Sequence, residues 1–320
     1  MYLFKYILKR LGLLVLTFLI IITICFVLIK LLPNKPTEQF GKDMELILKY
    51  REMMGYDKPI MVQYFRFWKY ALQGDFGVGE TVDPQVPIWS SFVSRLPFTI
   101  VLNVCAMVVS VPLGIAFGIW AALKKNKWQD HVISTGVMVF VSVPSFIYAF
   151  LVQYVLYFVL GWSSSTANTI NGAFSWDFIW SIYPAVLSMS FGSIAGFARF
   201  TRAELTEVLT SEFMLLARTK GLTRGQATLR HALRNAMVPI FPMILGEFIA
   251  VMSGSLIIEQ MFGIPGVGPL YLNAIQAKPN PDYNYFMLLS MFYIGIGLLA
   301  GIIVDISYGI IDPRIRIGAK

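Results

Sequence analysis

Six long apolar stretches separated by polar segments dominate the pattern of this 320-residue sequence. Crossing a bilayer takes roughly 20 apolar residues of helix, and each stretch is long enough to do so. None of them alternates strictly over segments of about 10 residues, as the strands of a membrane β-barrel do. The pattern therefore predicts an all-α polytopic membrane protein with six transmembrane helices, at about 11–32, 98–123, 132–160, 180–200, 238–258 and 285–310.

Composition and charge agree with this class and orient the chain. With 57% hydrophobic and 14% charged residues, the chain differs from a soluble domain. The formal charge of +8 is explained by the positive-inside rule rather than by nucleic-acid binding. Lys and Arg gather at the N-terminus and in the segments on its side, whereas the short loops 161–179 and 259–284 hold only Lys278. Both termini are therefore predicted to be cytoplasmic.

The spans divide the chain into four parts. Residues 1–32 form an N-terminal tail and a first span that is too long for a cleaved signal peptide. Residues 33–97 form an extracytoplasmic segment, whose apolar and aromatic residues predict one or two helices before a glycine-containing turn. Residues 98–311 form a five-helix core with a cytoplasmic loop at 201–236, and residues 312–320 form a cytoplasmic tail.

The cytoplasmic loop combines a short helix, a glycine break and a second helix. Ser211 is predicted to cap the first helix, and Gly221 to end it in a left-handed conformation. Thr223, with Gln226 three residues later, fits a capping box at the start of the second helix. This second helix is basic and leads back into a span, so the loop is typical of a surface that docks on a partner.

Motifs for catalysis and cofactor binding are missing from the sequence. It contains neither the GxxxxGK[ST] phosphate loop nor HExxH nor GxSxG. His131 and His231 stand alone, and Cys25 and Cys105 lie inside predicted spans and make no disulfide framework. We therefore expect a transport protein, not an enzyme, without catalytic residues, bound metal or cofactor of its own.

Two acidic residues, Glu247 and Asp305, lie at membrane depth. A charge there costs ~2.5–3.5 kcal/mol on insertion scales, so each is a functional candidate. Asp305 is near Arg314 and Arg316, at an inner helix end where water can reach it. For Glu247 two roles stay open, lining a transport path or pairing with a partner subunit. Glycines at small-xxx-small spacing predict close helix packing at 114/118, 192/196 and 297/301.

The run ARTKGLTRGQATLRHALRNAMVP, from Ala217 to Pro239, resembles the signature of B-type permeases of dipeptide and oligopeptide ABC importers. Other motifs of that branch occur elsewhere in the chain and in the same order as in the family. Before the run these are GYDKPIMVQYFRF, GDFGVG and SRLPFTIVL, and after it IIEQMFGIPGVGPL and VDISYGIIDPRIR. The general importer signature matches only in part, since Leu215, Leu216 and Arg234 stand where Glu, Ala and Pro are usual. An acidic contact at its start is therefore not expected.

The resemblance implies a type I ABC-importer permease fold and a pore-forming subunit in a bacterial or archaeal plasma membrane. The expected partners are a second homologous permease, two cytoplasmic ATPases that hold ATP and Mg, an extracytoplasmic peptide-binding protein, the peptide substrate and membrane lipid. Nucleic acid is not expected. The first loop helix would pass ATPase closure to the spans.

In that role, Phe213, Leu216 and Ala217 are expected to share one face of the helix and to seat it in an ATPase groove. Arg218 and Lys220 are expected to contact the rim of the groove. The coupling set is completed by Leu215 and Gly221 and, in the second loop helix, by Thr223, Arg230, His231 and Arg234.

Three matters stay open at this stage. Segment 262–270, FGIPGVGPL, is either a plain turn-rich external loop or a gate or docking contact for the binding protein. The cargo is a peptide or, within the same family, a nickel complex, glutathione or a glycoside. An autonomous channel or secondary carrier is a further class, which is disfavoured because the sequence shows no repeat with broken helices.

Overall fold

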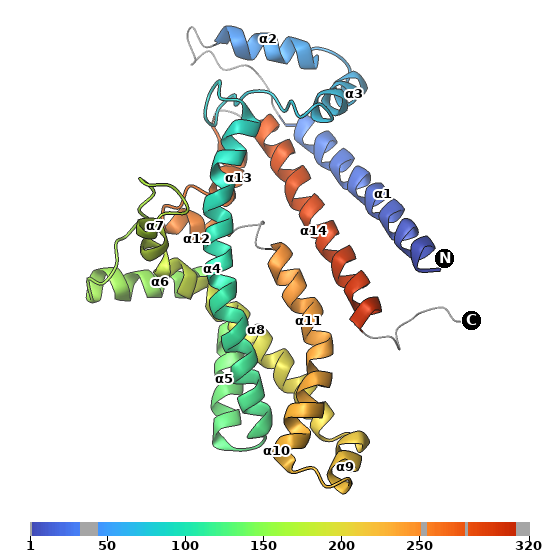
Figure 1. Ribbon diagram of the computed structural model, residues 1–320. Coiled ribbons are helices and arrows are strands. Elements are labelled where there is room, and N and C mark those ends of the chain that lie inside the picture. The colour runs from blue at the N-terminus through green and yellow to red at the C-terminus, as the bar shows by residue number, and fades with distance from the viewer. Residues whose placement is uncertain (1, 33–43, 251–254, 279–280, 312–320) are drawn as a thin grey trace. The chain divides into compact units, whose positions relative to one another are not determined.

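The computed structural model describes residues 2–32, 44–250, 255–278 and 281–311, which divide into two compact units. Unit 1 comprises residues 1–100 and 252–299, and unit 2 comprises residues 101–251 and 300–320. Both units are built from helices (Figure 1). Within the described ranges, extended chain forms only two isolated bridges, both in the segment 78–87. The predicted all-α class is confirmed.

Unit 1 contains the first span, the external segment and the loop before the last span. The external segment holds two helices, as predicted, and a turn in which Gly74 and Gly77 have φ angles of 77° and 82°. The helices of unit 1 are α1 (Tyr2–Lys30), α2 (Met44–Met54), α3 (Ile60–Ala71), the start of α4 (Ile88–Leu123), α12 (Leu256–Met261), α13 (Val267–Gln276) and much of α14 (Tyr283–Ile311).

Two apolar clusters hold unit 1 together. In the first, the ring of Phe26 on α1 lies 5.2 Å from Tyr64 and 5.5 Å from Phe67, both on α3. In the second, Ile88 at the start of α4 is buried with Leu270 of α13 and Tyr285 of α14. Burial of such aromatic and aliphatic side chains is the main favourable term in folding. The external segment therefore packs onto α1 instead of forming a separate domain.

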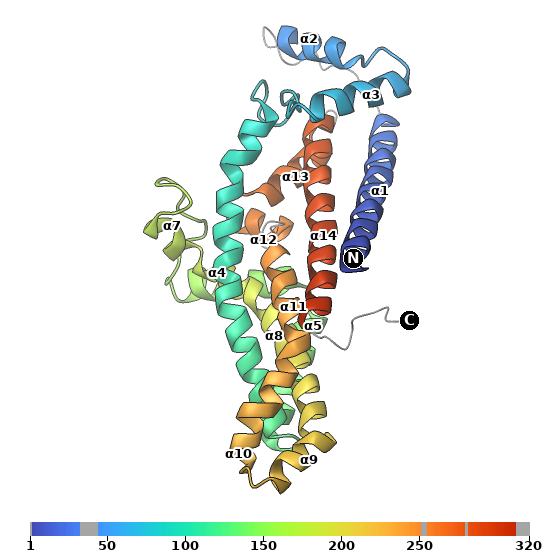
Figure 2. The same ribbon diagram turned by 45° about the vertical axis from the view of Figure 1, so that its right-hand side comes forward.

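Unit 2 is arranged around α8 (Tyr183–Leu209), which packs against α5, α6 and α11 (Figures 1 and 2). Its buried serines are satisfied within the helix, since Ser188 Oγ donates to the Pro184 carbonyl and Ser190 Oγ to the Val186 carbonyl, each at 2.7 Å. The other helices of unit 2 are the rest of α4, α5 (Trp128–Ser142), α6 (Ser145–Gln153), the π-helical turn η2 (Tyr154–Val159), α7 (Trp176–Ser181), α9 (Glu212–Thr219), α10 (Arg224–Ala227), the π-helical turn η3 (Thr228–Ala232), α11 (Leu233–Ala250) and the end of α14.

Four of the predicted spans are confirmed as helices long and apolar enough to cross a membrane. They are Ile7–Lys30, Ile88–Leu123, Arg224–Ile249 and Tyr283–Ser307. The stretch predicted at 180–200 is the 27-residue α8, whose length suffices but whose serines, glycines and inner charges make it less apolar. The described residues thus contain four such helices, or five if a bent pair counts as one span, where six were expected.

The bent pair replaces the continuous helix predicted at 132–160. The axes of Trp128–Ser142 and Ser145–Val159 differ by 101°. Between them Val143 and Pro144 are extended, with ψ angles of 128° and 140°. Pro144 lacks the N–H that would continue the helix, and a residue before proline is driven out of the helical region. The length of the apolar run at 132–160 does not by itself reveal this break.

Of the predicted glycine contacts, one pair brings two backbones together. A Cβ on Gly114 would lie 2.6 Å from the Cβ of Phe197, and one on Gly118 would lie 2.7 Å from the Ala198 carbonyl oxygen. Helix α4 therefore approaches α8 at a distance that only glycine permits. A Cβ on Gly192 would meet the Tyr148 hydroxyl at 3.3 Å, whereas one on Gly196, Gly297 or Gly301 would meet nothing within 4 Å.

Replacing Gly114 by Ala is predicted to lower the free energy of unfolding by about 1–3 kcal/mol, because the added methyl group overpacks the contact with α8. The measurement is denaturant titration of the purified chain in mixed micelles. Gly136→Ala on α5 is the matched control, since its Cβ would meet nothing within 4 Å. The control should be neutral or up to about 1 kcal/mol more stable. Equal stability of the two variants would contradict the close approach.

Candidate functional site

The inner end of unit 2 carries the segment predicted to dock on a partner, which we name the coupling segment, residues 211–236. Helix α9 begins after Ser211, but the predicted side-chain cap is wrong. Ser211 Oγ donates to the Val208 carbonyl at 2.6 Å and so turns back toward α8. The end of the helix is as predicted, because Gly221 has a φ of 90° and its N–H donates to the Arg218 carbonyl at 3.0 Å.

The second helix of the coupling segment starts with the predicted capping box. The Gln226 N–H donates to Thr223 Oγ1 at 3.3 Å, and the Thr223 N–H donates to Gln226 Oε1 at 3.1 Å. These two bonds satisfy amide groups that would otherwise lack a partner at a helix start. From there the helix continues without a gap through α10, η3 and α11 into the membrane. Only the short connection at 220–223 therefore separates α9 from the helix that becomes this span.

Helix α9 has one face buried in its own chain and one face exposed. Met214 and Ala217 belong to an apolar cluster that also contains Ala122 of α4 and Leu205 of α8. The prediction that Ala217 shares the outward face is therefore wrong, because only 8% of its surface is exposed. Three apolar side chains do point outward, namely Phe213, Leu215 and Leu216, which are 42%, 65% and 56% exposed.

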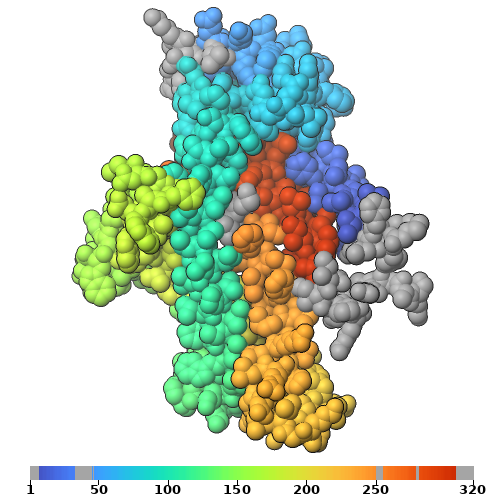
Figure 3. Space-filling view, in the orientation of Figure 1, coloured from blue at the N-terminus to red at the C-terminus, as the bar shows by residue number. Residues whose placement is uncertain are grey.

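The exposed charges of the coupling segment are mostly positive. Glu212 is the acidic residue of the coupling segment and lies at its start. The predicted basic residues are all exposed, namely Arg218, Lys220, Arg230, His231 and Arg234. The coupling segment also exposes Arg224 and Leu229, which sequence reasoning did not single out; Leu229 is 70% exposed. In the space-filling view the coupling segment, coloured gold, lies next to the turn between α4 and α5, coloured green (Figure 3).

The acidic residues at membrane depth have different surroundings. Glu247 on α11 is half-buried, and its Oε1 accepts a hydrogen bond from Ser193 Oγ on α8 at 2.7 Å. It thus has a partner within its own chain, while its role in a path or subunit contact stays a prediction. Asp305 is half-buried on α14, and Arg314 and Arg316 lie outside the described residues.

Segment 262–270, for which a turn-rich loop and a gate or docking contact were both left open, consists of a turn and loop at 262–266 followed by the start of α13, and it folds around a buried acid. Glu259 on α12 has no exposed surface, and its carboxylate accepts from the Ser255 N–H at 3.2 Å and the Gly268 N–H at 3.0 Å. A Cβ on Gly266 would overlap this carboxylate. Gly266 and Gly268 are therefore needed because the chain wraps closely around Glu259. Burial raises the pKa of Glu259 to about 7 although its hydrogen bonds lower it.

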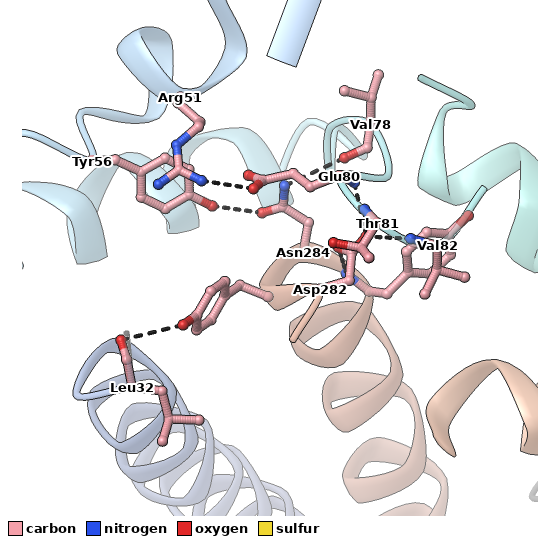
Figure 4. A network of polar contacts seen from close by, with 11 residues as sticks. Leu32, Arg51, Tyr56, Val78, Glu80, Thr81, Val82, Asp282 and Asn284 are labelled. Carbon is pink, nitrogen blue, oxygen red and sulfur yellow. Dashed lines mark hydrogen bonds and ion pairs between the residues drawn. The ribbon is translucent and has the colours of Figure 1, made fainter. Parts of the chain in front are cut away.

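A second buried acid organises the outer end of unit 1 (Figure 4). Asp282 Oδ2 accepts from three successive backbone N–H groups, those of Glu80, Thr81 and Val82, at 2.8, 2.9 and 3.1 Å. Glu80 in turn pairs with Arg51 at 2.7 Å. These bonds tie the 78–87 segment to the start of α14. Sequence reasoning missed Asp282, because no local pattern joins residues about 200 positions apart.

No group of three or more His, Cys, Asp or Glu side chains in the described part of the chain could hold a metal ion. Cys25 and Cys105 are both free. Glu259 and Asp282 instead accept hydrogen bonds from backbone N–H groups of loops and helix ends. The candidate site is therefore the exposed apolar face of α9 on a helical scaffold.

Comparisons with known proteins agree with this arrangement. The family described as binding-protein-dependent transport system inner membrane component matches residues 114–317, and the N-terminal family of such membrane components matches residues 3–103. The chain is 33% identical over 316 residues to the glutathione transport system permease protein GsiC of Salmonella paratyphi A, covering 98% of this chain and 99% of that protein. It is 34% identical over 321 residues to the dipeptide transport system permease protein DppB of Lactococcus lactis, with the same coverage.

The oligopeptide transport system permease protein OppB of Haemophilus influenzae is 33% identical over 313 residues, again covering 98% and 99% of the two chains. A chain from the crystal structure of an amino acid ABC transporter with histidines superimposes with a TM-score of 0.52 at 17% identity. That match covers 69% of this chain and 94% of the solved one, and supports the permease fold.

The raised pKa of Glu259 predicts a pH-dependent stability. The neutral form of Glu259 fits the buried site, whereas the ionised form does not. Its contribution to the free energy of unfolding is therefore complete below the ordinary pKa of 4.5 and is lost as the pH rises through about 7. The difference between the two pKa values corresponds to about 3 kcal/mol in the free energy of unfolding. The measurement is thermal unfolding in nanodiscs between pH 5 and 7.5. Wild type should lose stability over this range, Glu259→Gln should lose much less, and the exposed control Glu52→Gln should follow wild type. A Glu259→Gln profile parallel to wild type would contradict the assignment.

Proposed function

The chain belongs to the binding-protein-dependent transport system inner membrane component family, and from this premise we propose that it forms half of the pore of an ATP-driven peptide importer. The family consists of membrane-embedded transport components rather than enzymes. In this proposal the other half of the pore is a second, homologous permease. ATP and Mg are held by two cytoplasmic ATPases, and an extracytoplasmic binding protein delivers the peptide.

The observation that carries the proposal is the two-faced helix α9. Its inner face is locked into the chain by Met214 and Ala217, while Phe213, Leu215 and Leu216 are presented outward. An amphipathic helix of this kind suits an apolar groove on a partner, and the exposed basic residues of the same segment suit an acidic rim. Because the inner face is packed against α4 and α8, a partner that displaces α9 must displace these helices as well.

Peptide cargo is supported by what the relatives are named for. Relatives of similar identity transport dipeptides, oligopeptides and glutathione, which is itself a small peptide. All of these cargoes carry amide groups together with charged carboxylate and ammonium groups. Peptide is thus the class that the relatives share, with glutathione as one member of it. A nickel complex and a glycoside are the alternatives to be tested beside it.

An autonomous channel or secondary carrier is the second candidate class. It would need no outward docking surface on α9, because no ATPase would bind there. The exposed apolar side chains of α9 would then face water without a function, which is unfavourable for a soluble surface. The importer proposal gives these side chains a partner and is favoured for that reason.

Leu216→Asp is predicted to release the ATPases, since a charge placed at the centre of an apolar contact typically costs more than 2 kcal/mol, or about 30-fold in affinity. The tagged chain is purified from its native membrane in nanodiscs, and the retained subunits are identified by mass spectrometry. Wild type should retain two ATPases and a second permease, and the variant should lose only the ATPases. Leu72→Asp is the control, because Leu72 is 81% exposed and lies in the external segment.

The same preparation tests the cargo. ATP-dependent uptake into proteoliposomes is measured with a labelled dipeptide, labelled glutathione, nickel–histidine and a labelled glycoside. Uptake of either peptide supports the proposal, and exclusive uptake of nickel or glycoside selects the alternative cargo. Purification of the chain alone, with uptake that needs no ATP, would overturn the importer assignment.

A further inference from the structure

One buried ion pair in unit 2 is not explained by any of the functions described above. It joins Asp130, in the first turn of α5, to Arg202 on α8. The guanidinium group binds in bidentate form, with Nη2 donating to Asp130 Oδ2 at 2.8 Å and Nε donating to Oδ1. The Asp130 side chain is 2% exposed and the Arg202 side chain 32% exposed. Bidentate Arg–carboxylate pairs fix geometry as well as contributing energy.

Asp130 is also held from its own side. The Asn126 N–H donates to Oδ2 at 2.9 Å, and Ser134 Oγ donates to Oδ1 at 3.2 Å. Asn126 has a φ of 63°, so the turn between α4 and α5 closes on this carboxylate. With two donors from Arg202 and two from its own neighbourhood, the short side chain has no freedom to reorient. Arg202 is therefore coupled directly to the start of α5.

Other contacts between α5 and α8 in the described part of the chain are apolar. Val137 is buried with Ala195 and Ala198, and the ring of Phe140 stacks on Phe191 with centroids 4.9 Å apart. Apolar contacts of this kind have no preferred direction, and packed helices slide past one another over them in shear motions. The ion pair resists such sliding, because its hydrogen bonds hold only at one register.

The ion pair lies on the route from the coupling segment to α5. Arg202 is next to Thr201, which packs against α4. A Cβ on Gly118 of α4 would lie 2.5 Å from the Cβ of Thr201. One turn further along α8, Leu205 is buried in the cluster that receives Met214 of α9. A force applied to α9 thus reaches α8 through Leu205 and α5 through Arg202.

We propose that Asp130 and Arg202 form a positioning pair that makes α5 move together with α8 when the ATPases displace α9. This inference rests on the proposed importer function and adds a named linkage to it. Positive-inside counting treats Arg202 as one of the basic residues of the cytoplasmic loop. Its neutralisation by Asp130 sets it apart from the exposed basic residues of α9 and α10, which remain available to a partner.

The test uses the complete importer, purified with its ATPases and reconstituted in proteoliposomes. The variants are Asp130→Asn, Arg202→Gln, the double variant, and Arg202→Lys, which keeps the charge but loses the bidentate geometry. The control is Asp57→Asn, which breaks the Asp57–Lys58 pair, 2.8 Å long and exposed in the external segment. For each variant the rates of ATP hydrolysis and of labelled dipeptide and glutathione uptake are measured, together with the melting temperature.

We expect the variants to assemble and hydrolyse ATP while uptake per ATP falls at least about fivefold, the lower end of typical coupling effects. The double variant should be no worse than either single variant, because both remove the same linkage. Arg202→Lys should resemble Arg202→Gln, and Asp57→Asn should resemble wild type.

Two results would overturn the inference while leaving the importer function intact. In one, uptake per ATP is unchanged in assembled variants. In the other, uptake and hydrolysis fall in parallel with the melting temperature, which would mean that the pair only stabilises the fold. If the wild-type chain binds no ATPase at all, the importer function itself fails, and the inference fails with it.

Discussion

Helix α4 approaches α8 so closely at Gly114 and Gly118 that no side chain fits between the two backbones, and the rest of unit 2 depends on this contact. The two glycines are one turn apart, so they present a single flat face to α8. With α4 in place, α8 holds α5 through a bidentate ion pair and then leads directly into α9. The exposed apolar helix α9 is therefore packed on α4, α8 and the start of α11 instead of belonging to a loose loop.

Three buried acids, Asp130, Glu259 and Asp282, organise the connections between helices. Each is at most 2% exposed, and each accepts hydrogen bonds from backbone N–H groups of a nearby turn or loop. A carboxylate without such partners would be expelled from the interior, so the loop must fold around the acid once the acid is buried. The same chemistry thus shapes the α4–α5 turn, the loop between α12 and α13, and the 78–87 segment. None of these acids is among those predicted from membrane depth.

Basic residues serve two separate purposes in this chain. Arg202 forms an ion pair with Asp130 inside the fold, whereas Arg218 and Lys220 are exposed near the apolar side chains of α9 in the sequence. All three contribute equally to the orientation of the chain in the membrane, because the positive-inside rule counts charges near the span ends regardless of their later contacts. Orientation and docking are therefore distinguishable only when the partners of each charge are known.

The sequence by itself determined the helical class, the presence of helices between the first two spans, and the capping box and glycine stop of the coupling segment. These features depend on apolar run length and on contacts within four residues, both of which are local. Only the tertiary structure decided which face of α9 is buried, which glycines touch a neighbour, and which charges are paired. Asp130 and Arg202 are 72 positions apart, and Glu80 and Asp282 are 202 positions apart. Such pairings follow from the packing of whole helices, and no local pattern in the chain records them.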